Sequence, residues 1–83
     1  MNLIKLEEVL FVFDNWTLML KSESCSELVP GKNVSLFNEA EKQLGEATLV
    51  KYLRSKNPDI SAIEIKVNSD LDDLKQVRFV ALI

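Results

Sequence analysis

Hydrophobic and polar residues alternate with a period of two near the C-terminal end of the chain. Between residues 63 and 67, isoleucine or valine occupies every second position, with a glutamate and a lysine between them. Because successive side chains of a strand point to opposite faces of a sheet, this pattern predicts a strand with one solvated face. Residues 77–83 contain a single polar side chain, Arg78, and predict a second, more deeply buried strand. The acidic stretch 70–74 between them is typical of one helical turn, with acids at the positive end of its dipole.

A second β-rich pattern lies near the N-terminus. Residues 9–13 are all apolar and residues 16–20 are again rich in β-forming side chains, whereas Asp14 and Asn15 between them favour a turn. Two such runs separated by two turn-forming residues predict a β-hairpin.

The middle of the chain decides the fold class, and it supports two interpretations. Asn38 followed by Glu41 matches the capping box at the start of a helix, and the residues after them are good helix formers. Asn57 followed by Pro58 is a suitable helix end. The first interpretation is therefore a helix over residues 39–56.

Two observations oppose a single long helix. Gly45 would stand in its middle, at a cost of about 1 kcal/mol relative to alanine. The apolar stripe also shifts: at about 100° per residue, the residues on one helical face are Phe37, Ala40, Leu44 and Ala47, and those about a third of a turn or more away are Leu49, Val50 and Leu53. The second interpretation is a hairpin of residues 34–37 with 47–53, joined by a connection over 38–45.

The scarcity of turn-forming residues favours the helix. The chain has two glycines and two prolines, few for the many tight turns of a small barrel. We therefore expect a single domain over residues 1–83 of α+β class. Its antiparallel sheet would have about four strands in two hairpins, with the central helix packed on one face. The alternative is a small all-β barrel of about six strands.

Composition narrows the chemistry. The chain of 83 residues has no histidine, one cysteine and a net charge of −3. The commonest general base and metal ligand are thus absent, and paired carboxylates stand only in polar stretches that would not desolvate them. The acidic cluster Asp70, Asp72 and Asp73 lacks the glycine and the final glutamate of a calcium loop. We expect no enzymatic activity, no metal, no cofactor and no small-molecule substrate.

Cys25 and the N-terminal sequence indicate the compartment. Cys25 has no second cysteine to pair with, whereas small secreted domains usually contain several disulfides. The N-terminal residues include acids and lack the basic region and apolar core of a signal peptide. No apolar stretch is long enough to span a membrane. We therefore expect a cytoplasmic protein with no membrane partner.

Two features suggest contacts with another protein. Trp16, beside the polar turn, belongs to a residue type that is enriched in interface cores. The terminal strand, which includes Phe79, has few of the charges and none of the prolines that block pairing at a sheet edge. Its two apolar faces nevertheless favour a central place in the sheet. We expect a small non-catalytic protein, regulatory or homodimeric, that acts by binding a protein.

The alternative partner is a nucleic acid. Lys51, Tyr52, Arg54 and Lys56 form the one basic cluster of the sequence, and basic residues around an aromatic ring can bind phosphates and stack on bases. A solvated end of the predicted helix explains the same residues. The net acidic charge opposes this function, since nucleic-acid binders usually have a basic excess.

Overall fold

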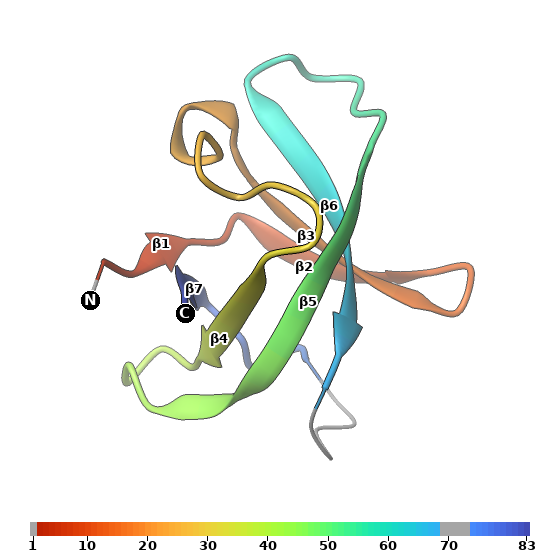
Figure 1. Cartoon of the computed structure of the whole chain (residues 1–83). Coiled ribbons are helices and arrows are strands. Elements are labelled where there is room, and N and C mark those ends of the chain that lie inside the picture. The colour runs from red at the N-terminus through yellow and green to blue at the C-terminus, as the bar shows by residue number, and fades with distance from the viewer. Residues whose placement is uncertain (1, 69–73) are drawn as a thin grey trace.

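The computed structural model describes residues 2–68 and 74–83. In this part of the chain nearly all regular structure is one antiparallel sheet, accompanied by a single 3-10 turn, η1 (Ser22–Ser24). The seven strands are β1 (Ile4–Lys5), β2 (Glu8–Val12), β3 (Asn15–Lys21), β4 (Asn33–Phe37), β5 (Gln43–Leu53), β6 (Ile60–Val67) and β7 (Phe79–Leu82). Their order across the sheet is β1-β7-β4-β5-β6-β3-β2 (Figure 1).

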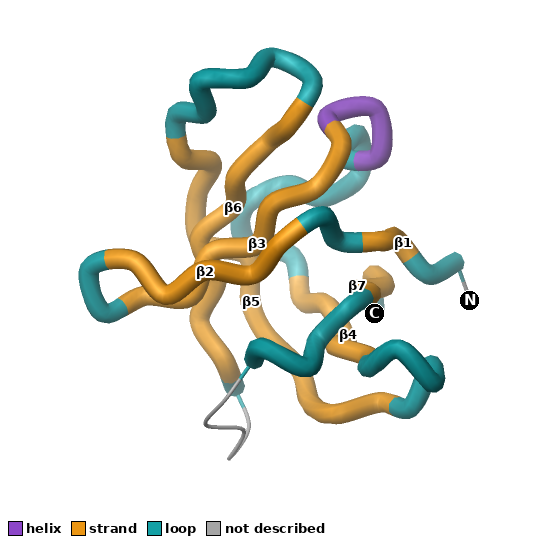
Figure 2. The backbone as a smooth tube through the Cα atoms, turned by 180° about the vertical axis from the view of Figure 1, so that it is seen from behind, coloured by secondary structure: helices purple, strands orange, loops and turns teal. Residues whose placement is uncertain are grey.

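The N-terminal segment joins the two edges of this sheet. β1 pairs with β7 at one edge and β2 pairs with β3 at the other, although only two residues separate β1 from β2. The hydrogen-bonding partner of this segment changes between two consecutive residues. The N–H of Leu6 donates to the Arg78 carbonyl at 2.9 Å, and the N–H of Glu7 donates to the Met19 carbonyl at 2.7 Å. The sheet is therefore rolled into a barrel that one bent strand closes (Figure 2).

The predicted α+β fold is wrong, and the all-β alternative fits. Most of the predicted helix, residues 39–56, forms β5, which pairs with β4 on one side and with β6 on the other. The Asn38 side chain caps a turn instead of a helix, since the Lys42 N–H donates to its Oδ1 at 3.0 Å. The second interpretation, a hairpin of residues 34–37 with 47–53, is confirmed by the pairing of β4 with β5. In the described residues no helix is long and apolar enough to cross a membrane.

Two bulges explain why the sequence of β5 does not alternate as a strand should. The register with β4 skips Leu44, and the register with β6 skips Val50. Each extra residue shifts the alternation of faces by one position. Leu49 and Tyr52, three residues apart, consequently lie on the same face, opposite Ile65 and Ile63 of β6. A spacing of three is also the spacing of neighbours on a helix, so the segment has a helical pattern without a helix.

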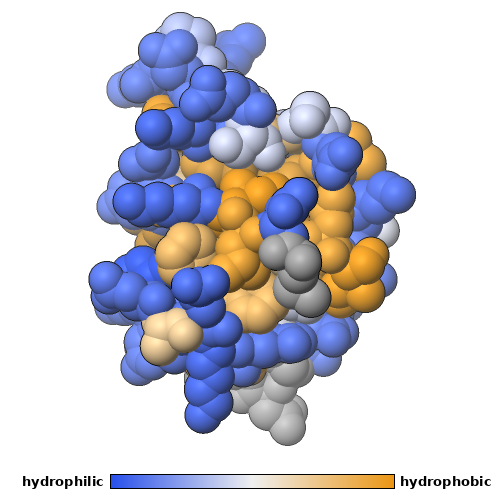
Figure 3. Space-filling model, turned by 90° about the vertical axis from the view of Figure 1, so that its left-hand side faces the viewer, coloured by the Kyte–Doolittle hydropathy of each residue, from blue (hydrophilic) through white to orange (hydrophobic). Residues whose placement is uncertain are grey.

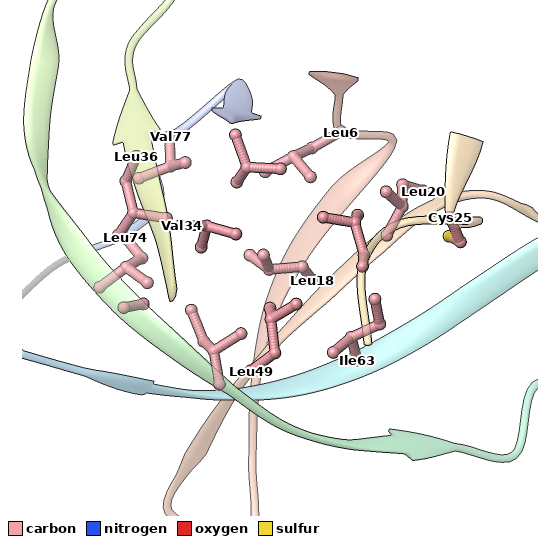
Figure 4. Packing of buried hydrophobic residues seen from close by; sticks show 14 residues of the cluster. Leu6, Leu18, Leu20, Cys25, Val34, Leu36, Leu49, Ile63, Leu74 and Val77 are labelled. Carbon is pink, nitrogen blue, oxygen red and sulfur yellow. The ribbon is translucent and has the colours of Figure 1, made fainter. Parts of the chain in front are cut away.

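The core fills the inside of the barrel. Leu18 and Leu20 of β3 and Val34 and Leu36 of β4 are each at most 1% exposed, and Figure 4 shows such side chains converging between the strands. Burial of one leucine contributes about 1.5–3 kcal/mol. The buried cluster draws on every strand except β1 and β2 and also on the loops: Leu6, Leu18, Leu20, Cys25, Leu28, Val34, Leu36, Ala47, Leu49, Ile63, Ile65, Leu74, Val77 and Val80.

Both strands predicted near the C-terminus are confirmed, as β6 and β7. β7 pairs with β1 through Ile4 and Lys5 and with β4 along its whole length, so it is an interior strand, as its two apolar faces predict. The alternative of an open edge at β7 is wrong. The predicted helical turn over 70–74 falls outside the described residues, apart from Leu74, and the acidic cluster Asp70, Asp72 and Asp73 falls outside them as well.

Candidate partner-binding surface

The turn between β2 and β3 contains an aromatic residue that is unfavourable for two reasons, its backbone angle and its exposure to solvent. The predicted hairpin is confirmed, but its two turn residues are Phe13 and Asp14, one position earlier than predicted. Their φ angles are 49° and 65°, those of a type I′ turn, which usually contains Asn-Gly. A bulky side chain at positive φ is rare and strained, and the Phe13 side chain is also 93% exposed. Neither folding nor solubility explains a phenylalanine there.

Phe11 and Trp16 lie at the base of this turn. They are direct partners in the register of β2 with β3, and their rings meet edge to face with centroids 4.9 Å apart at 62°. Phe11 is 57% exposed, whereas Trp16 is half-buried and packs against the core. Trp16 thus packs against the core and remains partly accessible to solvent. We call Phe11, Phe13 and Trp16 the tip cluster.

A groove of about 430 Å³ runs beside the tip cluster. Trp16, Ile65 and Val67 supply its apolar lining, and Asp14 and Lys66 are among its charged lining residues. The bulge in β5 brings an exposed apolar side chain, Val50, to the same groove. Apolar surface with a polar border is the usual composition of a protein interface.

A second groove, of about 380 Å³, lies between the start of β2 and the segment before β7. Leu6 and Val9 line it on one side and Val77 on the other, with Glu7 and Glu8 also among its lining residues. We call it the β2 groove. Lys75 and Arg78 complete its lining, so the groove is mostly charged, with both signs present.

A third apolar area lies on the side of the barrel that carries both termini. Hydrophobic side chains gather in the middle of this face and hydrophilic ones surround them (Figure 3). Ile83, at the C-terminal end, is 70% exposed. Its N–H donates to the Asn33 carbonyl at 3.1 Å, which holds the end of the chain against the start of β4.

The structure separates the members of the predicted basic cluster. Lys51 lies opposite Glu64, and Tyr52 lies opposite Ile63, so the two side chains point to opposite faces of β5. Arg54 and Lys56 are exposed in the connection that follows β5. Tyr52 therefore does not form a common surface with Lys51.

The Tyr52 side chain instead anchors the loop after β3. Its hydroxyl lies within hydrogen-bonding distance of two backbone carbonyls, that of Cys25 at 3.1 Å and that of Leu28. Burial raises the pKa of this hydroxyl, and the nearby Cys25 raises it further. The group thus stays a protonated donor at neutral pH.

Cys25 is placed for packing. It is buried, and its Sγ donates to the Lys21 carbonyl at 3.4 Å. Burial raises the pKa of the thiol, an effect that a hydrogen bond with Ser61 partly offsets. Because the thiolate is the reactive form, Cys25 is a poor nucleophile here.

The remaining predicted contact residue, Phe79, is half-buried in β7 between Lys5 of β1 and Phe37 of β4. β7 and β3 are not neighbours in the sheet, so Phe79 does not extend the tip cluster. Among the described residues, no three cysteines and carboxylates are grouped as they would be around a metal ion.

The sequence led to Trp16 but not to Phe11 or Phe13. Phe13 stands directly before Asp14 in the sequence. If the predicted turn moves by one residue toward the N-terminus, Phe13 becomes a turn residue instead of a strand residue. No protein-family model, curated protein or solved structure shows significant similarity to this chain.

Proposed function

We propose that this protein is small, non-catalytic and acts by binding another protein through the tip cluster. The observation that carries the proposal is Phe13, which is 93% exposed at a φ of 49°. Burial of a phenylalanine in a partner is worth about 1.5–3 kcal/mol. Backbone strain of this kind costs about 1–3 kcal/mol and is concentrated at functional sites.

The rest of the tip cluster fits the same function. Aromatic side chains near the centre of an interface supply most of its binding energy. Trp16 is held by the core on one side and by the Phe11 ring on the other, so it loses little side-chain freedom when a partner binds.

The proposal of a non-catalytic, cytoplasmic protein rests on composition and on Cys25. The chain has no histidine, and its one thiol is buried with a raised pKa. An unpaired cysteine is usual in a reducing compartment. A nucleic-acid partner is less well supported, because Tyr52 and Lys51 lie on opposite faces and the net charge is −3.

The experiment compares wild-type protein with Phe13→Asn after each is immobilised and exposed to a lysate of its own source. Asparagine tolerates positive φ, so this variant keeps or improves the turn while it removes the aromatic ring. Val29→Asn is the matched control, since Val29 is an exposed apolar residue outside the tip cluster. We expect a captured protein that wild type and Val29→Asn retain and that Phe13→Asn loses by at least about tenfold.

Equal capture by all three proteins would contradict the proposal. A nucleic acid in place of a protein would appear as binding of oligonucleotides at ~50 mM salt that falls steeply as the salt concentration rises. Such binding would persist in Phe13→Asn and be lost in Lys51→Gln.

A further inference from the structure

β2 has an open edge. In residues 2–68 and 74–83 it pairs with β3 alone. The two-residue turn makes Val12 and Asn15 a hydrogen-bonded pair, and such pairs alternate along an antiparallel ladder. The N–H and C=O groups of Val9 and Phe11 therefore point away from β3, ready to bond to a further strand.

This edge lacks the usual protection against pairing. Natural edge strands are blocked by lysine, proline or inward-pointing charges. β2 contains neither lysine nor proline, and its one charge, Glu8, stands at its first position. Phe11, next to the central residue of this strand, is 57% exposed. The strand thus has the properties of an interface.

We propose that the partner is a second copy of this chain, and that the two β2 strands pair antiparallel about Leu10. This inference rests on the proposed protein-binding function and names its partner. The register follows from the open groups, because Val9 must lie opposite the second copy's Phe11 for their N–H and C=O groups to bond. Leu10 then lies opposite Leu10, and Glu8 lies opposite Val12.

The self-pairing is chemically complementary. No carboxylate of one strand lies opposite a carboxylate of the other, which would be destabilising. On the face that carries Trp16, the exposed ring of Phe11 meets Val9 of the second copy, and aromatic with β-branched residues is a favourable cross-strand pair. Leu10, on the other face, meets its own equivalent.

The same register brings the turn of each copy close to the β2 groove of the other. Each paired strand ends at Val12, opposite Glu8 of the other copy, so the second copy's turn with Phe13 follows at the β2 groove of about 380 Å³. Val9 offers a half-buried apolar side chain there, and Lys75 and Arg78 are among the charged lining residues. Twofold symmetry produces this contact twice, as in any closed dimer. One strand pairing thus places the most exposed aromatic residue of each copy beside the groove of the other.

The test introduces a positive or a negative charge at Leu10, the residue at the symmetry axis. Leu10→Lys and Leu10→Glu each place like charges directly opposite each other, so each should raise the dimer dissociation constant by at least about tenfold in sedimentation equilibrium. An equimolar mixture of the two variants should restore the dimer. Val29→Lys and Val29→Glu are the controls, because Val29 is exposed in the loop before β4, away from β2 and the tip cluster, and these variants should dimerise like wild type.

A second readout removes only the outward hydrogen bond. N-methylation of Phe11 in synthetic protein keeps the side chain and the ladder to β3, and should weaken the dimer without loss of the barrel's circular dichroism signal. Trp16, the only tryptophan, reports the same equilibrium, since its fluorescence maximum should move to longer wavelength as the dimer dissociates on dilution.

Two results would overturn the inference: a wild-type protein that is monomeric at every concentration, or a dimer that withstands both Leu10 substitutions. The proposed function is tested separately. A monomer whose Phe13→Asn variant loses a captured protein refutes the second copy as partner but keeps the tip cluster. If Phe13→Asn changes neither capture nor self-association, the proposed function fails as well.

Discussion

The hydroxyl of Tyr52 reaches across from β5 to the backbone carbonyl of Leu28. This contact joins residues 24 positions apart and ties the loop after η1 to the barrel wall. Leu28 is 1% exposed, so the same contact fixes a loop residue that belongs to the buried core.

Substitution of Tyr52 by phenylalanine should lower the free energy of unfolding by about 1–2 kcal/mol. The ring would remain, but the part-buried Leu28 carbonyl would lose this donor, whereas the Cys25 carbonyl would keep the Leu28 N–H at 3.0 Å. Chemical denaturation measures the total loss of stability. Relative to wild type, amide hydrogen exchange in the variant should become faster at residues 25–28 than it does in β6. Uniform exchange across the barrel would contradict a local role for the hydroxyl.

Alkaline pH should destabilise the protein through two groups. The pKa values of Cys25 and Tyr52 are both raised by folding above their ordinary values of 9.0 and 10.0. The folded state therefore prefers the protonated forms, and its advantage is complete below those values and is lost as the pH rises through the folded pKa values. We expect the unfolding free energy to fall above about pH 9.

The measurement is denaturant unfolding over a series of pH values, with Tyr52→Phe as the comparison. That variant should lose stability less steeply than wild type at high pH. Tyr52 is the only tyrosine, so the absorbance of tyrosinate follows its titration directly. An identical pH dependence of the two proteins would show that the hydroxyl titrates alike in the folded and unfolded states.

A substitution in the turn between β2 and β3 should increase the stability of the protein. Phe13→Asn should raise the free energy of unfolding by about 1 kcal/mol, because asparagine adopts positive φ with less strain than phenylalanine. Thermal unfolding measures the change. A conservative change at a strand position with ordinary backbone, Phe11→Tyr, serves as control and should have little effect. A loss of stability in Phe13→Asn would mean that the exposed ring supports the monomer.

Two threonines should respond oppositely to replacement by valine. Thr17 is 3% exposed and its Oγ1 has no hydrogen-bond partner in the described structure. Thr48 Oγ1 donates to Asn33 Oδ1 at 2.7 Å and accepts from the Asn68 side chain at 2.7 Å. Because a buried unpaired hydroxyl costs about 1–3 kcal/mol, Thr17→Val should stabilise the protein, whereas Thr48→Val should destabilise it by about 1 kcal/mol.

Chemical denaturation of the two variants tests this contrast. Destabilisation by both substitutions would imply that a bound water satisfies Thr17.

The strands that were predictable are those whose pairing partners impose a regular alternation. β6 alternates cleanly between Glu64, Lys66 and the buried isoleucines, and the apolar composition of β7 indicates its interior position. β5 is different. Its residues favour a helix locally, and the two bulges give it helix-like spacing, so pairing with β4 and β6 outweighs local preference.

The tip cluster was only partly predictable for a related reason. Aspartate and asparagine are both good turn residues, which favours Asp14-Asn15 as the turn. The observed register instead pairs Val12 with Asn15 and leaves Phe13 in the turn. Hairpin register depends on which faces the barrel buries, and that is a property of the assembled sheet, with Leu18 and Ile63 facing inward.

Closure by the bent N-terminal strand has a consequence for biosynthesis. β1 contributes residues 4 and 5 and bonds to residues 79 and 80, so the barrel seam joins segments from opposite ends of this sequence. During translation the early hairpin emerges long before its seam partner. The barrel can therefore close only after residues 79 and 80 have been made, and until then β1 has no neighbour to pair with.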